Sequence, residues 1–264
     1  MKLPSGTYFG DRAEALSVGR YQLTWHRYPP KERLPAHVHT HPYLSVAVSG
    51  KYQECFSANK EMQVNPMQVL LRPSGYRHAN TFGKEAGWCF NLDWEGKFPD
   101  WMPELFSLDQ PKNWEVSPWE LTLLMHASIM DFAEDELNLL ADEAMIGLGK
   151  YAHTNRYTEK VTSMLEYLHG RYAEPCSLEE MGLTLKVHPV YLSRIFKRVM
   201  GMTIGQYLRR LRITKSWGDL WGNESLTGIA HDRGFCDQAH YSKTFKNLLG
   251  QTPSQARKKM RKLE

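Results

Sequence analysis

The 264-residue chain contains no apolar run that approaches the length of a membrane span, and residues 1–6 have no signal-peptide core. It has few cysteines, and none of them shows the paired spacing of a zinc motif: Cys55, Cys89, Cys176 and Cys236. These absences argue against membrane-spanning, secreted and disulfide-stapled classes of protein. We therefore expect a cytosolic protein with reduced thiols and enough chain to bury two cores.

The last third of the chain contains an internal repeat. The segment Ser193–Lys197 recurs as Ser242–Lys246, at an offset of 49 residues, and Ser177-Leu178 recurs as Ser225-Leu226, at an offset of 48. A repeat of this length is usually one supersecondary unit used twice. In both copies, apolar residues at helical spacing lie on either side of a short break, which predicts two helix-turn-helix units.

The turns of the two copies differ at one position. In the second copy, Gly234 can supply a left-handed turn residue, and Asp237 can cap the helix that follows. In the first copy, His188 precedes Pro189 at the expected start of the second helix. Lys186 stands where the second copy has Gly234, so the first turn either carries a strain of ~1 kcal/mol or adopts another geometry.

These residues carry a family resemblance. The second copy contains the ordered series Ile229-Ala230, Gly234-Phe235, Asp237, Tyr241, Phe245-Lys246, Gly250 and Thr252-Pro253. With the upstream copy, this series resembles AraC/XylS-type transcription regulators over roughly the last 105 residues. The resemblance implies double-stranded DNA as a partner, a homodimer and an upstream sensing domain for a small-molecule effector. RNA polymerase is a second candidate partner.

The charge distribution agrees with a polyanionic partner. Residues 155–264 contain 19 Lys and Arg against 10 Asp and Glu, a net charge of +9, whereas residues 1–154 contain 14 against 19, a net charge of −5. A basic region beside an acidic one is expected when a single domain contacts phosphates.

The predicted second helix of each copy has a polar side left over for DNA. The expected contact residues are Val190, Ser193, Arg194 and Lys197 in the first copy and Gln238, His240, Ser242 and Lys243 in the second. Arg194 suits a bidentate guanine contact and Gln238 an adenine contact, whereas the lysines fit either bases or phosphates. Between the copies, residues 204–220 predict an amphipathic helix that holds the two units at a fixed separation.

The first half predicts short strands, over residues 21–26, 43–48, 51–56, 68–71 and 88–92. Such strands suggest a small antiparallel barrel or double-sheet roll. The segment Pro35–His39 with Ser49-Gly50, and the later segment Pro73–His78 with Asn80, resemble the two short motifs of cupins. The resemblance implies a barrel with an interior cavity.

Histidines dominate the expected cavity. We predict an effector pocket lined by His37, His39, His41, Tyr43, Tyr52, His78 and Trp88. His37, His39 and His78 can also close three corners of a metal site. Metal-binding cupins place a Glu shortly after the paired histidines, but Tyr43 and Leu44 occupy that neighbourhood here, so polar lining is the preferred interpretation and no cofactor is expected.

Two apolar stripes, within residues 119–132 and 137–148, predict an antiparallel helix pair that covers the barrel or forms a dimer contact. The expected fold is therefore α+β with two domains: a cupin-like barrel with a helix pair (1–150), a linker (151–157) and a double helix-turn-helix domain (158–264). The predicted function is a sequence-specific, effector-controlled transcription regulator and not an enzyme. A metal-dependent cupin enzyme or metal sensor fused to a DNA-binding module is the alternative.

Overall fold

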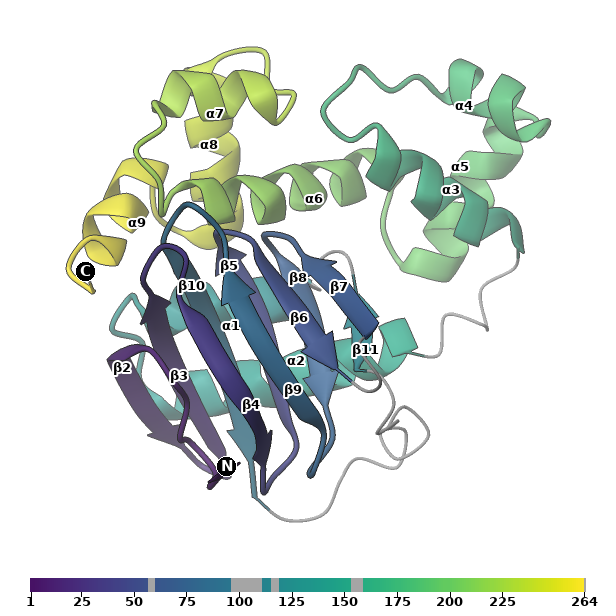
Figure 1. Cartoon of the computed structure of the whole chain (residues 1–264). Coiled ribbons are helices and arrows are strands. Elements are labelled where there is room, and N and C mark those ends of the chain that lie inside the picture. The colour runs from purple at the N-terminus through teal and green to yellow at the C-terminus, as the bar shows by residue number, and fades with distance from the viewer. Residues whose placement is uncertain (57–59, 96–110, 115–118, 153–158, 264) are drawn as a thin grey trace. The chain divides into compact units, whose positions relative to one another are not determined.

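The computed structural model describes residues 1–56, 60–95, 111–114, 119–152 and 159–263, and all structural statements below concern these residues. They form two compact units, one of residues 1–149 with 256–264 and the other of residues 150–255. Figure 1 shows the strands in the first unit and helices in both units. The expected two-domain α+β fold is confirmed.

The first unit contains two sheets (Figure 1). In spatial order, the five-stranded sheet consists of β1 (Lys2–Leu3), β4 (Arg33–His39), β9 (Arg77–Phe82), β6 (Tyr52–Phe56) and β7 (Lys60–Val64). The six-stranded sheet consists of β11 (Lys112–Trp114), β8 (Gln68–Arg72), β5 (Tyr43–Ser49), β10 (Gly87–Trp94), β3 (Tyr21–Tyr28) and β2 (Asp11–Val18). All neighbouring strands are antiparallel except β1 and β4.

Two helices, α1 (Trp119–Ser128) and α2 (Glu134–Ala152), pack on the six-stranded sheet. The Trp25 indole on β3 donates to Ser128 Oγ at 3.1 Å, and the Tyr21 hydroxyl donates to Asp142 Oδ1 at 2.6 Å. Since Tyr21 and Trp25 lie on one face of β3, the other face is left for the interior of the unit. The predicted helix pair is confirmed, although α1 ends at Ser128, before the last residues of its apolar stripe.

The second unit contains α3 (Glu159–Gly170), α4 (Leu178–Leu185), α5 (Pro189–Met200), α6 (Ile204–Asp219), α7 (Leu226–Asp232) and α8 (Gln238–Leu249). A further helix, α9 (Pro253–Met260), follows. The two predicted helix-turn-helix units are α4–α5 and α7–α8, and the predicted connecting helix is α6. Residues 151 and 152 of the predicted linker continue α2, and the rest of that linker lies outside the described residues.

Local capping fixes where these helices begin. Ser177 and Ser225 are equivalent N-caps of α4 and α7, and each hydroxyl accepts from a backbone N–H three residues later, at 3.0 and 2.9 Å. Thr203 and Gln206 form a reciprocal capping box at the start of α6. In the two copies of the repeat, the first helix therefore begins at equivalent residues.

Lys186 adopts the left-handed conformation, with φ 52° and ψ 44°, and Gly234 in the second copy has φ 76°. The first copy therefore keeps the same kind of turn and places a lysine in a backbone region that disfavours side chains. Of the two outcomes expected from the sequence, the structure shows the strained one.

Candidate DNA-binding surface and ligand pocket

The second helix of the first helix-turn-helix, α5, is amphipathic. Leu192 and Phe196 are fully buried, and Phe196 packs on Tyr207 of α6 with ring centroids 5.5 Å apart. His188 caps the helix by accepting from Val190 N at 3.3 Å, and Pro189 occupies its first turn. The four residues expected to contact DNA are all exposed: Val190, Ser193, Arg194 and Lys197.

The equivalent helix of the second helix-turn-helix, α8, is capped by Asp237, whose carboxylate accepts from His240 N at 2.7 Å. Tyr241 and Phe245 are fully buried. Of the residues expected at DNA, Gln238, His240 and Lys243 are exposed and Ser242 is half-buried. Gln238 Oε1 accepts from Thr227 Oγ1 of α7 at 2.7 Å, so a bidentate adenine contact would require Gln238 to leave this hydrogen bond.

An arginine just beyond α7 ties the second helix-turn-helix to α6. Arg233 Nε and Nη2 donate to the two carboxylate oxygens of Asp219 at 2.6 and 2.7 Å, and Arg233 Nη1 donates to the Tyr172 hydroxyl at 2.5 Å. Such a bidentate pair fixes orientation as well as distance. Arg233 was not predicted as a functional residue, because nothing in the repeat marks it.

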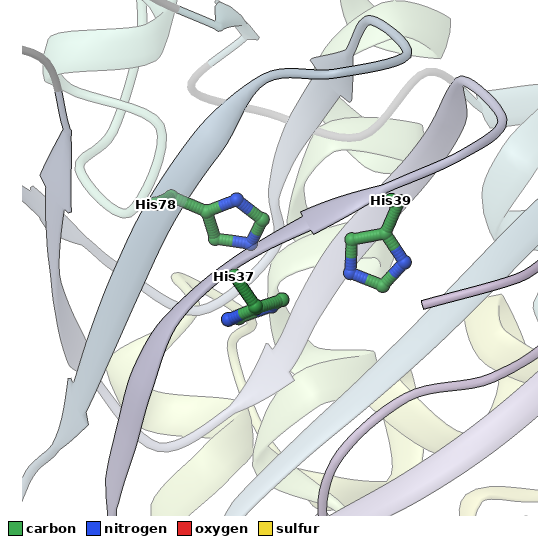
Figure 2. Close-up of side chains that lie close together, drawn as sticks. All are labelled: His37, His39 and His78. Carbon is green, nitrogen blue, oxygen red and sulfur yellow. The ribbon is translucent and has the colours of Figure 1, made fainter. Parts of the chain in front are cut away.

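In the first unit, three histidines lie close together between the two sheets. His37 and His39 are on β4, and His78 is directly opposite His37 on β9. One ring nitrogen from each lies within 4.8 Å of the others, and all three side chains are buried (Figure 2). The structure thus brings together the three residues that were expected to be able to hold a metal.

Backbone carbonyls orient two of these rings. His37 Nδ1 lies 2.8 Å from the Pro35 carbonyl oxygen, and His78 Nδ1 lies 3.4 Å from the Tyr76 carbonyl oxygen. A carbonyl oxygen only accepts, so Nδ1 carries the proton in both rings. The lone pair is then on Nε2 of His37 and of His78.

The local electrostatics keep all three imidazoles neutral. Burial, followed by the neighbouring histidines and Arg72, lowers the pKa of His39 to about 2. Burial also lowers the pKa of His37 and lowers the pKa of His78 well below its ordinary value. Neutral imidazole is the form that binds metal ions.

Two tyrosines complete this end of the pocket. The Tyr43 hydroxyl donates to His78 Nε2 at 3.4 Å, and burial raises the pKa of Tyr43 above its ordinary value. Tyr8, from the segment before β2, packs on His39 with ring centroids 5.0 Å apart and donates to Asp93 Oδ2 at 2.6 Å. Tyr8 was not expected in the pocket, because its segment gives no strand signal.

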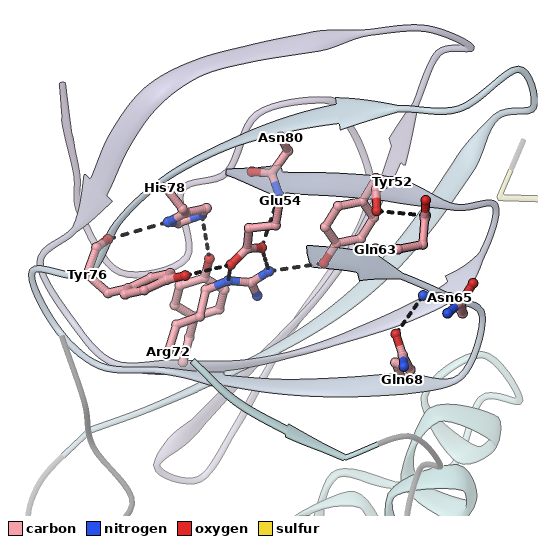
Figure 3. A network of polar contacts seen from close by, with 10 residues as sticks. Tyr52, Glu54, Gln63, Asn65, Gln68, Arg72, Tyr76, His78 and Asn80 are labelled. Atoms are coloured by element: carbon pink, nitrogen blue, oxygen red, sulfur yellow. Dashed lines mark hydrogen bonds and ion pairs between the residues drawn. The ribbon is translucent and has the colours of Figure 1, made fainter. Parts of the chain in front are cut away.

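Beside the histidines is a buried polar network that contains Glu54 (Figure 3). Arg72 pairs with both Glu54 carboxylate oxygens, and its Nη2 also donates to the Tyr52 hydroxyl at 3.0 Å. Tyr76 and Asn80 donate to Glu54 at 3.1 and 3.2 Å. The carboxylate oxygens of Glu54 are therefore engaged by four hydrogen bonds from protein donors.

The pocket between these groups is small, with a volume of about 30 Å³. Of the residues expected to line an effector pocket, five lie on the wall of this cavity: His37, His39, His78, Tyr43 and Tyr52. Two predicted lining residues are corrected by the structure. His41 is exposed on a turn and contacts Thr40 Oγ1 at 3.0 Å, and Trp88 lies on β10 outside the lining, which that strand supplies through Cys89 and Asn91.

Residues 183–259 match the family model of a helix-turn-helix domain. The chain is 28% identical over 162 residues to the HTH-type transcriptional regulator YisR of Bacillus subtilis, covering 58% of this chain and 56% of that protein. It is 29% identical over 103 residues to the HTH-type transcriptional activator AarP of Providencia stuartii, covering 39% and 76%. The chain thus spans about half the length of YisR.

Among solved structures, ToxT of Vibrio cholerae aligns over 91% of this chain and 98% of its own, at 11% identity and a TM-score of 0.38. At that TM-score the likeness supports no conclusion about the first unit. For the second unit, the family match, the relatives and the doubled motif all indicate a helix-turn-helix domain. The C-terminal part of the chain is an AraC-type helix-turn-helix domain.

Among the described residues, no helix combines the length and the apolar character needed to cross a lipid bilayer.

Proposed function

We propose that this chain is a sequence-specific DNA-binding transcription regulator whose affinity for DNA is controlled by a ligand held in the first unit. The observation that carries the proposal is the pair of helices α5 and α8. Each is anchored by at least one fully buried aromatic residue, and each presents polar or basic residues at its exposed N-terminal half. This is the presentation that a recognition helix needs to read base edges in a major groove.

Charge supports the same conclusion. Residues 155–264 contain 19 Lys and Arg against 10 Asp and Glu, so the helix-turn-helix region is attracted to phosphates at long range. A regulator of this kind acts where the DNA is, which in a bacterium is the cytoplasm. RNA polymerase is a further proposed partner, because a regulator bound near a promoter lies within its reach.

We also propose that two copies associate through α2. Leu139 and Ile146 are seven residues apart on this helix and are 61% and 57% exposed, although the face formed by Leu137, Ala141, Ala144 and Leu148 is buried. Large apolar side chains one heptad apart on an otherwise polar face favour a helix-to-helix contact. Sedimentation of wild type and of Ile146→Glu tests this, with a shift toward monomer expected for the variant.

The DNA-binding proposal is tested by selecting fragments from random-sequence DNA with the full chain. We expect a site with two half-motifs about one helical turn apart, because each helix-turn-helix reads one major-groove face. Recovery of no enriched sequence, with binding that is equal for all fragments, would contradict a sequence-specific regulator.

A further inference from the structure

The size of the pocket between the two sheets limits which kinds of regulatory ligand it can hold. Pockets for organic effectors typically enclose about 300–1,000 Å³. The pocket between the two sheets encloses about 30 Å³, and a single buried water needs ~10–15 Å³. Its volume therefore suits an ion or a few water molecules far better than a sugar or an aromatic acid.

The donor atoms at the pocket select the kind of ion. In His37 and His78 the lone pair is on Nε2, because their Nδ1 protons are engaged by the carbonyls of Pro35 and Tyr76. A ring N–H donated to a backbone carbonyl is the usual support of a metal-binding histidine. Imidazole ligands favour zinc and the neighbouring divalent transition metals over magnesium or calcium.

A fourth donor atom is the hydroxyl oxygen of Tyr43, on β5. The Tyr43 oxygen lies 3.4 Å from His78 Nε2, which is about the separation of two ligands held ~2.0–2.1 Å from one tetrahedral ion. Glu54 cannot take this place without leaving Arg72, Tyr76 and Asn80. The one carboxylate of the polar network is thus committed to that network, and the tyrosine faces the histidines.

We propose that His37, His39, His78 and Tyr43 form a closed, four-ligand site for a divalent cation of the zinc class, and that this cation is the regulatory ligand. The inference rests on the proposed function for its regulatory part, whereas the site itself rests on the pocket geometry alone. Closing on a tetrahedral ion requires the most separated histidine nitrogens, now within 4.8 Å, to approach by up to about 1.4 Å, since two ligands held ~2.0–2.1 Å from one ion lie about 3.4 Å apart. Side-chain adjustments of this size are common on binding.

The identity of the fourth ligand distinguishes a metal-sensing site from a catalytic metal site. Catalytic zinc sites keep one position open for water or substrate, whereas structural sites are filled by four protein ligands. With Tyr43 in the fourth position, the ion has no open place for a substrate. The site therefore favours a metal that changes conformation over a metal that performs catalysis.

The test uses the full chain, stripped with a chelator and titrated with Co²⁺, whose visible absorption is intense when four-coordinate and weak when six-coordinate. We expect uptake of one Co²⁺ per chain with the intense spectrum, and displacement by one equivalent of Zn²⁺. Tyr43→Phe should retain the ion but give a shifted visible spectrum, because water replaces the tyrosine oxygen as the fourth ligand. No stoichiometric uptake, or an unchanged spectrum in Tyr43→Phe, overturns the closed site.

Two histidine variants provide a matched pair. His39→Ala removes a pocket ligand and should weaken Co²⁺ binding at least tenfold, whereas His41→Ala removes an exposed histidine two residues away and should leave it unchanged. Equal weakening by both would assign the ion to the surface and overturn the site. Circular dichroism shows whether His39→Ala folds; if it does not, His39→Gln replaces it, and retained wild-type affinity in that folded variant also counts against the site.

DNA binding is measured on the same stripped and loaded samples, using duplexes selected with the untreated full chain. A change in affinity of about 5- to 150-fold on loading is expected for an allosteric ligand. Equal affinity of both forms overturns the regulatory role. Loss of metal uptake with DNA binding intact removes this inference and leaves the regulator, whereas metal uptake without DNA binding in either form removes the regulator and leaves the site.

Discussion

Arg72 on β8 and Glu54 on β6 form an ion pair between the two sheets, with side chains 3% and 0% exposed (Figure 3). The pair joins strands of different sheets, so it fixes how the sheets face each other. The pair also keeps the Glu54 carboxylate engaged, so Glu54 is not a candidate metal ligand.

Arg72→Met should destabilise the first unit by about 3–5 kcal/mol, because it leaves the Glu54 carboxylate buried without its cation. The double variant Glu54→Gln/Arg72→Met removes both charges and should recover a substantial part of that loss. Urea unfolding of wild type and the variants checks this. A double variant as unstable as Arg72→Met plus the separate loss for Glu54→Gln would show that the two residues do not interact.

Lys186→Gly should stabilise the second unit by up to ~1 kcal/mol, since glycine relieves the left-handed strain but adds freedom to the unfolded chain. Gly234→Ala should do the opposite, because its φ is 76° and the new Cβ would lie 2.3 Å from the Ala173 carbonyl oxygen. Thermal unfolding measures both changes. Two shifts of the same sign would contradict the equivalence of the two turns.

Arg194→Ala should weaken binding to a selected DNA site by ~1–3 kcal/mol and relax the sequence preference, because a base contact is lost. Lys197→Ala, on the same helix, should weaken binding to all sequences equally if Lys197 contacts a phosphate. Competition between selected and scrambled duplexes separates the two effects. A uniform loss for Arg194→Ala would reassign that residue to the DNA backbone.

Acid should destabilise the first unit through His26, a 2% exposed residue on β3. Burial, with a smaller effect from Arg12, lowers the pKa of His26 to about 4, below the unfolded value of ~6.5. The folded state then binds fewer protons, so stability is complete above pH ~6.5 and falls as the pH drops toward 4, by at most about 3 kcal/mol. Unfolding of His26→Phe across this range should show a shallower decline, and an unchanged decline would exclude His26 as the cause.

The sequence predicted some strands better than others for a physical reason. β8 and β10 are buried on both faces, so they appear as apolar runs, and both were expected. β9 alternates exposed and buried residues, and its buried positions include His78 and Asn80, so its composition gives little strand signal. This strand nevertheless supplies His78, Asn80 and Phe82 to the wall of the pocket.

The DNA-binding surface was predictable from the sequence because the patterns that define it are local. Capping residues, turn glycines and helical periodicity placed α5 and α8 and their exposed residues from sequence alone. The ion pair of Glu54 with Arg72 and the approach of Tyr8 to His39 depend on how distant segments meet. No local pattern encodes those contacts, and the same holds for His41, which shares the spacing of His37 and His39 but lies on an exposed turn.

The central claim is that the doubled helix-turn-helix binds duplex DNA through phosphates and bases, and a salt titration of affinity tests it most directly. Fluorescence anisotropy with a selected duplex should give log K falling linearly with log salt concentration, with a slope of about −0.9 per phosphate contacted. A scrambled duplex should bind more weakly at every concentration. An affinity that does not change with salt, or equal affinity for both duplexes, would contradict the account.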